Sequence, residues 1–214
     1  MEVRVVSVTE LSRKERERQH RRQEILSAAL QLFAEKGFHN VSMHEIAKAA
    51  EFGTGTLYHF FPSKEDLFFE LLLSCADEAL GLILPSLEGP GDELQKLVDF
   101  IHAHERIARE QAAAIQLYLL ESQGRYLPGP RVEAKRAEIN ERITSRLAEV
   151  IAAGVRKKIF NDVDPSVAAR CLVAALQSMI LADPQATDLQ TDVKKLEAVF
   201  FKGLVKSSGD KRDA

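Results

Sequence analysis

The stretch VSMHEIAKAAEFGTGTLYHFFPSK, residues 41–64, decides the fold of this chain. Ser42 and Glu45 have the S-x-x-E spacing of a capping box, in which two side chains satisfy free backbone groups at a helix start. The apolar residues that follow predict one short helix, and a second is predicted from Thr54 to about residue 60. Two short helices joined by a tight turn form a helix-turn-helix, whose second helix fits the major groove of DNA.

The rest of the chain reads as helices separated by prolines, with no period-2 run that would indicate a strand. We therefore predict an all-α fold of about nine helices, with three in an N-terminal unit and six in a larger C-terminal unit. The predicted helices span residues 12–36, 42–50, 54–60, 63–84, 92–123, 131–158, 164–181 and 189–205. The segment 92–123 admits a break near residues 109–110, and residues 85–91 and 124–130 are predicted loops. The predicted domains are residues 1–62 and 63–208, and residues 209–214 form a tail.

Charge is distributed unevenly along the 214 residues. Residues 1–64 hold ten Lys and Arg against eight Asp and Glu, whereas the remainder holds 19 against 24. The whole protein is therefore not a general polyanion binder, and any nucleic-acid face is expected to be local and near the N-terminus.

The quoted blocks resemble the TetR/AcrR family of bacterial transcriptional regulators over residues 21–71. The resemblance is carried by Ile46 and Ala47, by GTLYHFFP at 55–62 and SKEDL at 63–67, and by LFAEKGF at 32–38. It implies an N-terminal DNA-binding domain and a C-terminal helical domain for effector binding and dimerisation. Glu51 departs from the family pattern, in which glycine is common at this position. The turn there favours a positive φ, which glycine adopts readily.

The resemblance also implies which residues contact double-stranded DNA. The expected base- or backbone-facing residues are Thr54, Gly55, Thr56 and His59, the expected phosphate contacts are Tyr58 and Lys64, and a further backbone cluster is Ser42, Met43 and His44. The alternative to DNA contact is a solvated turn with ordinary helical packing, in which Tyr58 is a half-buried aromatic residue. Since the second helix has no Lys or Arg for a bidentate guanine contact, DNA shape is expected to contribute to specificity.

A second basic stretch, residues 13–22, admits two interpretations. Its i,i+4 charge pairs suit a solvated helix surface, and its arginines equally suit an arm that touches phosphates or the minor groove.

An effector cavity is expected between residues 92 and 156, because His104 interrupts an inward apolar stripe and the resembling family binds effectors in this domain. The candidate ligand contacts are Phe100, His104, Gln116 and Leu120. The alternative for His104 is an ordinary boundary histidine. A metal site is not expected, because His102 and His104 are two residues apart on a helix and point to different sides.

The last two helices carry apolar residues on two faces, which suits packing inward and against a second copy. The predicted homodimer interface comprises Ala168, Cys171, Ala175, Met179, Leu196, Phe200 and Gly203. The alternative is a pair of ordinary core helices.

The expected cellular compartment and the expected lack of catalysis rest on features that are not found in the sequence. Cys75 and Cys171 are expected to be buried, reduced thiols, and no apolar run suits a signal peptide or a membrane span, so a cytoplasmic protein is expected. No catalytic constellation is evident, so we expect neither an enzyme nor a cofactor. The function expected is a homodimeric repressor released from a near-palindromic operator by a small, mostly apolar effector. The alternative is a DNA-bound adaptor of the same fold that binds a protein instead.

Overall fold

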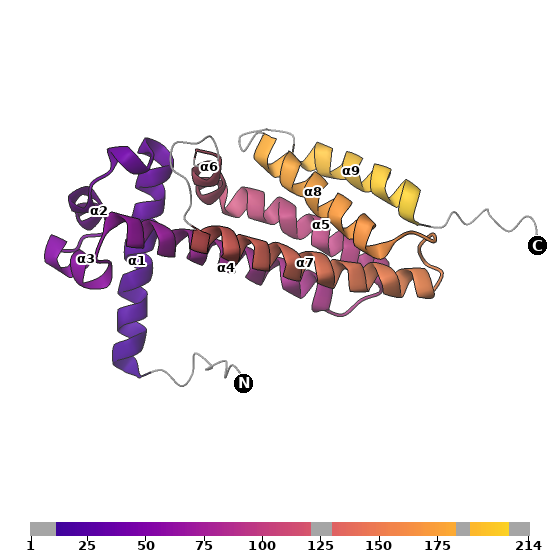
Figure 1. Ribbon diagram of the computed structural model, residues 1–214, viewed down its shortest axis with the longest axis horizontal. Coiled ribbons are helices and arrows are strands. Elements are labelled where there is room, and N and C mark those ends of the chain that lie inside the picture. The colour runs from indigo at the N-terminus through magenta and orange to yellow at the C-terminus, as the bar shows by residue number, and fades with distance from the viewer. Residues whose placement is uncertain (1–11, 121–129, 183–188, 206–214) are drawn as a thin grey trace, which may run out of the picture. The chain divides into compact units, whose positions relative to one another are not determined.

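Every helix predicted from the sequence is present in the computed structural model, which describes residues 12–120, 130–182 and 189–205 (Figure 1). Within these ranges the chain forms nine α-helices and one short 3-10 helix, and its β pairing is a single isolated bridge. The all-α prediction is therefore confirmed. Contacts divide the chain into two compact units, residues 1–71 and 72–214.

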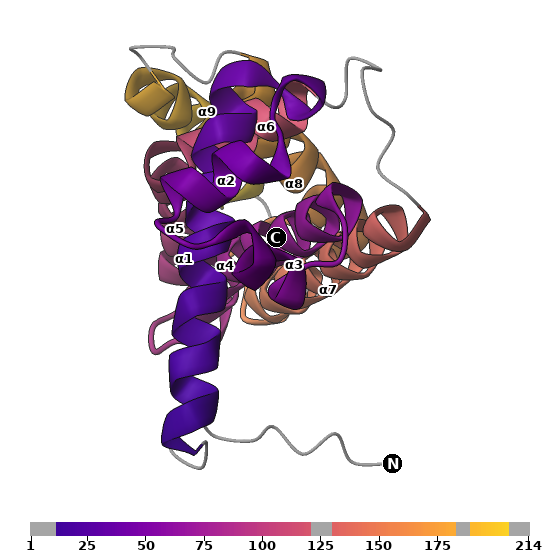
Figure 2. The ribbon, with the colours of Figure 1, turned by 90° about the vertical axis from the view of Figure 1, so that its left-hand side faces the viewer.

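The first unit contains α1 (Arg13–Lys36), η2 (Phe38–Asn40), α2 (Met43–Ala49), α3 (Thr54–Phe60) and the start of α4 (Lys64–Glu88). Figure 2 faces this unit and shows α2 crossing beside the long α1. Ser12 and Glu15 form a capping box that begins α1, and Gly37, at φ 77°, ends it. Local capping residues thus set both ends of this helix.

Phenylalanines form the centre of this unit. The rings of Phe33, Phe38 and Phe68 lie with centroids 4.8 to 5.5 Å apart, and all three side chains are almost fully buried. Leu57 of α3 and Ile46 of α2 are 0% exposed, so both short helices are anchored in this core by one apolar face.

The helix α4 runs further than predicted. The sequence placed a loop at residue 85, but the helix continues through Pro85 to Glu88. Proline removes one helical hydrogen bond, yet Leu87 in the following turn is 1% exposed and Gly89 N donates to the Pro85 carbonyl at 2.8 Å. Burial of that leucine helps to offset the missing bond, and the expected loop is wrong for residues 85–88.

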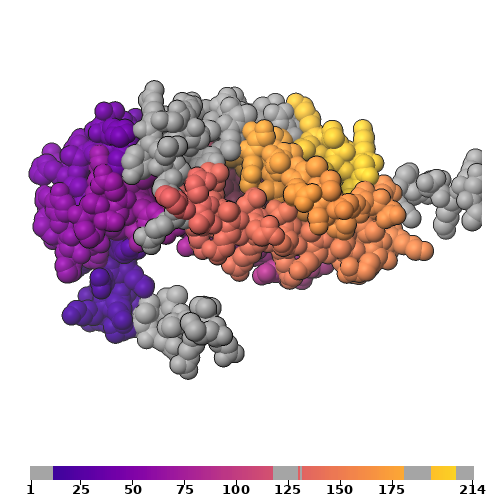
Figure 3. All heavy atoms as spheres, in the orientation of Figure 1, coloured from indigo at the N-terminus to yellow at the C-terminus, as the bar shows by residue number. Residues whose placement is uncertain are grey.

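The second unit is a helical bundle built around α5 (Glu93–Glu110). Its other members are the rest of α4, α6 (Ala112–Leu120), α7 (Pro130–Arg156), α8 (Pro165–Ala182) and α9 (Leu189–Leu204). The predicted break after α5 is confirmed at Gln111. The helix α5 packs against α7, α8 and α9, and Figure 3 shows the atoms of α7 and α8 side by side across one face of this unit.

One close approach joins α7 to the segment that follows it. A Cβ placed on Gly154 would lie 2.1 Å from the Phe160 ring, so only glycine lets this buried ring pack there. Phe160 also bridges to Val205, and Asn161 N donates to the Leu204 carbonyl at 2.6 Å. These backbone contacts join the segment before α8 to the end of α9, and so close the base of this helix pair.

The two thiols differ in exposure. Cys75 is partly buried, and burial raises the pKa of its thiol to about 11. Cys171 is exposed, so the prediction that it is buried is wrong for the single chain. Among the helices of the described ranges, none combines the length and hydropathy that crossing a membrane requires.

Candidate functional site

The start of α2 is fixed by the predicted capping box. Ser42 Oγ accepts from Glu45 N at 3.2 Å, and Glu45 Oε2 accepts from Ser42 N at 2.8 Å. The backbone and side-chain hydrogen bonds from Ser42, with the nearby Lys36 ammonium, lower the pKa of Glu45 to about 2. Ser42 therefore has a structural role, whatever else it contacts.

The turn between α2 and α3 is a Schellman motif with an unusual residue. Phe52 N donates to the Ala47 carbonyl at 2.9 Å, and Glu51 N donates to the Lys48 carbonyl at 3.2 Å. Glu51 has φ 60°, the left-handed conformation that glycine adopts at no steric cost. The turn thus holds its geometry in spite of this residue.

The helix α3 presents its polar residues outward. Leu57 points into the core, whereas Gly55, Tyr58 and His59 are exposed. A Cβ added to Gly55 would meet no atom within 4 Å, so the described residues leave open space beside this stretch of backbone. The outward surface of α3 is therefore accessible.

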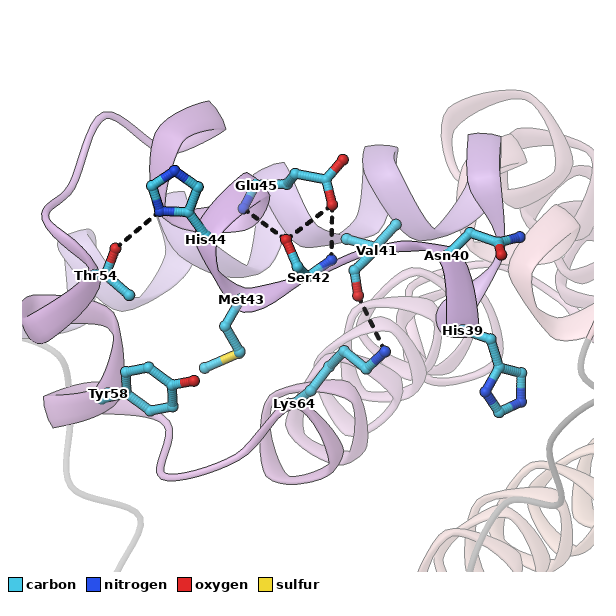
Figure 4. A pocket seen from close by; sticks show the side chains of 10 residues that line it. All are labelled: His39, Asn40, Val41, Ser42, Met43, His44, Glu45, Thr54, Tyr58 and Lys64. Atoms are coloured by element: carbon cyan, nitrogen blue, oxygen red, sulfur yellow. Dashed lines mark hydrogen bonds between the residues drawn. The ribbon is translucent and has the colours of Figure 1, made fainter.

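The beginnings of α2 and α3 are tied together by side chains. His44 Nδ1 lies 3.3 Å from Thr54 Oγ1, a hydrogen bond between the first turns of the two helices. Residues from the 39–42 segment, α2, α3 and α4 surround an open concavity of about 540 Å³ (Figure 4). Its lining includes these predicted DNA contacts: Ser42, Met43, His44, Thr54, Tyr58 and Lys64.

The remaining predicted contacts, Gly55, Thr56 and His59, lie on α3 but do not line this concavity. Met43 is 8% exposed, so its side chain packs inward and only its backbone suits a DNA contact. In Figure 4 the Tyr58 hydroxyl points toward the Met43 side chain. The concavity therefore mixes side chains that face outward with others that support the fold.

Lys64 has internal partners for its ammonium. Its Nζ donates to the Phe38 carbonyl at 2.8 Å and to the Val41 carbonyl at 3.0 Å, and it lies 4.3 Å from the centroid of the Phe38 ring. The Lys64 ammonium, which the sequence predicts to contact a phosphate, thus holds the segment that leads into α2.

The basic stretch at residues 13–22 forms the first turns of α1 and is mostly exposed. Arg13 pairs with Glu17 at 3.0 Å, as its spacing predicts. Arg22 pairs with Glu70 at 2.8 Å and lies over the Phe61 ring at 5.1 Å, so it packs within the fold.

A second candidate site is a cavity of about 410 Å³ within the second unit, formed by α4, α5, α7 and α8. Its lining is mostly apolar: Ala76, Ala79, Ile83, Ile107, Ala137, Ile139, Ile143 and Ile180. Its polar lining residues are His104, Glu133, Arg136, Asn140 and Gln177.

Of the four predicted ligand contacts, only His104 lines this cavity. Phe100 is fully buried and packs its ring against His104 at 4.5 Å, so it supports the site from behind. Gln116 is exposed on α6, and Leu120 ends α6 with its side chain outside the described residues. Sequence reasoning missed the α7 residues, although Arg136, Asn140 and Ile143 repeat every three or four positions on one helix face.

The predicted dimer residues are accessible on the single chain. Cys171 and Gly203 are exposed, and Ala168, Ala175, Met179, Leu196 and Phe200 are partly exposed. Val167 and Val199 are also exposed, Val199 at 72%. Apolar surface thus remains uncovered on α8 and α9.

Comparison with known proteins gives consistent matches along the chain. Residues 25–71 match the family model for bacterial regulatory proteins of the tetR family, and residues 90–181 match the model of the tetracyclin repressor-like C-terminal domain. The chain is 31% identical over 192 residues to the HTH-type transcriptional regulator UidR of Escherichia coli K12, covering 88% of this chain and 91% of UidR.

Solved structures agree in fold. A TetR/AcrR-family regulator from Thermobifida fusca matches with TM-score 0.71 and 27% identity, over 90% of this chain and 100% of that one. A protein from Saccharomonospora viridis, solved in complex with choline, matches with TM-score 0.76 and 22% identity over 88% and 100% of the two chains. With its helix-turn-helix and its second helical unit, this chain belongs to the TetR family of DNA-binding transcriptional regulators.

Proposed function

We propose that this regulator is a homodimeric repressor that a small, mostly apolar effector releases from a near-palindromic operator. The observation that carries the proposal is the cavity of about 410 Å³ in the second unit, whose walls are mainly isoleucine and alanine. Cavities of this size and composition hold small molecules. An adaptor that binds a protein partner needs no such hollow, so the cavity favours an effector.

For the DNA side, Thr54, Gly55, Thr56 and His59 are the proposed contacts to bases or nearby backbone. The exposed Tyr58 is a proposed phosphate contact. The threonine methyl groups suit thymine methyls, and the open surroundings of Gly55 allow its backbone to approach the groove.

For assembly, the uncovered apolar surface of α8 and α9 is the proposed contact between two copies. Residues such as Ala175 and Gly203 allow close approach, and Val199 supplies apolar area. A twofold dimer presents two copies of α3 to successive major grooves about 34–36 Å apart, which is the reason to expect a near-palindrome.

The proposed route from effector to DNA is α4. This helix carries Lys64 at its start and the cavity residues Ala76, Ala79 and Ile83 further along, without interruption. An effector releases DNA only if it binds one conformer better than the other, and a 100-fold preference corresponds to about 2.7 kcal/mol.

The test begins with the full-length protein and a library of random duplexes. Repeated selection should recover a near-palindrome, and sedimentation should show two chains on one duplex. Compounds that raise the melting temperature are then added to the selected complex. The proposal requires that at least one such compound lowers operator affinity, and stabilising compounds that all leave DNA binding unchanged would contradict it.

A further inference from the structure

The deeper wall of the second-unit cavity contains one polar side chain among apolar ones. Ile83, Ile107 and Ile143 are between 5% and 7% exposed, and His104 beside them is 5% exposed. Burial of an imidazole in such surroundings opposes its charged form and lowers the pKa of His104 to about 4. At neutral pH this ring is uncharged.

The hydrogen bond to Phe100 fixes which nitrogen of His104 carries the proton. Nδ1 lies 2.9 Å from the Phe100 carbonyl oxygen, which can only accept, so Nδ1 is the donor. In a neutral imidazole Nε2 then has a lone pair and no proton. No residue within the described ranges is hydrogen-bonded to Nε2. His104, a residue of the cavity wall, therefore has an unoccupied hydrogen-bond acceptor.

The other polar residues lie at the exposed edge of the cavity and already have partners. Arg136 pairs with Glu133 at 3.4 Å, and both side chains are about half exposed. Gln177 donates to Asn140 Oδ1 at 3.3 Å across α7 and α8. Among the described lining residues, the edge therefore carries no uncompensated charge that would select an anion or a cation.

We propose that the cavity takes an uncharged, largely apolar molecule bearing a hydroxyl group, which donates a hydrogen bond to His104 Nε2. The isoleucines receive the apolar body, and the paired groups at the edge face its other end. A ligand that places only an acceptor oxygen at that position has no proton to share with Nε2. The lone pairs of the oxygen and of Nε2 then repel each other. The inference rests on the proposed effector function, because it names the ligand class for the same cavity.

The experiment uses four probes with one nine-carbon skeleton: 2-nonanol, 2-nonanone, nonanoate and nonylammonium. Binding to the full-length protein is measured by calorimetry at pH 7.5, below the concentration at which any probe forms micelles. We expect 2-nonanol to bind about tenfold more tightly than 2-nonanone, the effect of one buried hydrogen bond with its desolvation penalty. Both ions are expected to bind more weakly than the alcohol, because their charge loses its hydration.

Two variants assign the preference to a residue. His104→Leu should bind 2-nonanol and 2-nonanone with equal affinity, since it keeps an apolar side chain there and removes the acceptor. His102→Leu makes the same change at an exposed position of α5 that does not line the cavity, so it is the matched control and should keep the tenfold ratio. Thermal unfolding of each variant without probe establishes that it is folded, and should His104→Leu fail to fold, the alcohol-to-ketone ratio of the wild-type protein decides alone.

Equal affinity for alcohol and ketone in the wild-type protein, tighter binding of either ion, or no binding by any probe overturns the ligand class. Operator affinity is measured separately with the same probes. An alcohol preference that depends on His104, without DNA release, leaves the ligand class standing and counts against the proposed repressor mechanism. Release by another probe without an alcohol preference overturns the ligand class alone.

Discussion

The Lys64 ammonium lies 3.0 Å from the Val41 carbonyl oxygen and donates a hydrogen bond to it. Val41 directly precedes Ser42, the residue that caps α2, and the same ammonium also donates to the Phe38 carbonyl. A lysine at the start of α4 therefore positions the segment that begins the helix-turn-helix.

Lys64→Ala is expected to lower the free energy of unfolding by about 1–3 kcal/mol, because two carbonyl groups lose a charged donor. Affinity for all DNA sequences should fall together, while the slope of log K against log salt stays nearly unchanged. A direct phosphate contact would instead reduce that slope by about 1. Urea unfolding and salt-dependent fluorescence anisotropy measure both quantities, and an unchanged stability with a reduced slope would refute the positioning role.

Tyr58→Ala is the matched variant for Lys64→Ala. The side chain of Tyr58 is half exposed, so its loss should weaken DNA binding with little effect on unfolding.

Glu51→Gly is expected to stabilise the protein by about 1 kcal/mol, because glycine removes the steric cost of the left-handed conformation at φ 60°. Glu51→Ala keeps the Cβ and serves as the control, with no comparable gain. Chemical denaturation of the three proteins gives the comparison. If alanine stabilises as much as glycine, the effect comes from removing the carboxylate and not from the backbone.

Val199→Asp is expected to convert the proposed dimer to monomers and to abolish tight operator binding. Val199 is 72% exposed on the single chain, so a charge there is tolerated by the fold but not within an apolar interface. Sedimentation velocity at micromolar concentration reports the change. Gln95→Lys, on an exposed position of α5, adds a charge elsewhere and should remain dimeric. A dimeric Val199→Asp protein would exclude this face.

Stability is expected to fall between pH 6.5 and pH 4 through His104. The unfolded chain binds a proton with the ordinary histidine pKa of 6.5, and the folded chain only near 4, so the unfolded state holds more protons in this window. The loss between pH 7 and pH 5 is about 2 kcal/mol. Glu45, whose pKa is lowered from 4.5 to about 2, loses its contribution mainly below pH 4.5, so it adds little between pH 7 and pH 5.

Urea unfolding at pH 7 and pH 5 tests this dependence. His104→Leu should lose less stability over that interval than the wild-type protein. Identical losses in the two proteins would show that His104 is not the group responsible.

Local features of the fold were predictable from the sequence. The capping box at Ser42, the break at Gln111 and the unfavourable position of Glu51 each depend on residues within one turn. Pro85 was not predictable in this way, because the burial of Leu87 in the folded core decides whether the helix continues.

The candidate sites were predictable only in part. His104 was identified because it interrupts an apolar stripe, but the cavity also needs α4 and α8, which the chain brings to α5 only on folding. The carbonyl partners of Lys64 lie in a preceding segment that no spacing rule connects to it. Contacts between distant segments therefore account for what the sequence left undetermined.

The backbone closure at the base of α8 and α9 bears on how this part of the molecule opens over time. Asn161 lies in a connecting segment, where amide protons ordinarily exchange quickly with solvent, yet its N–H is held by the Leu204 carbonyl. Exchange at Asn161 therefore requires the end of α9 to separate from the segment before α8. Slow exchange at Asn161 would then report how firmly the end of α9, part of the surface proposed to join two copies, is held to the segment before α8.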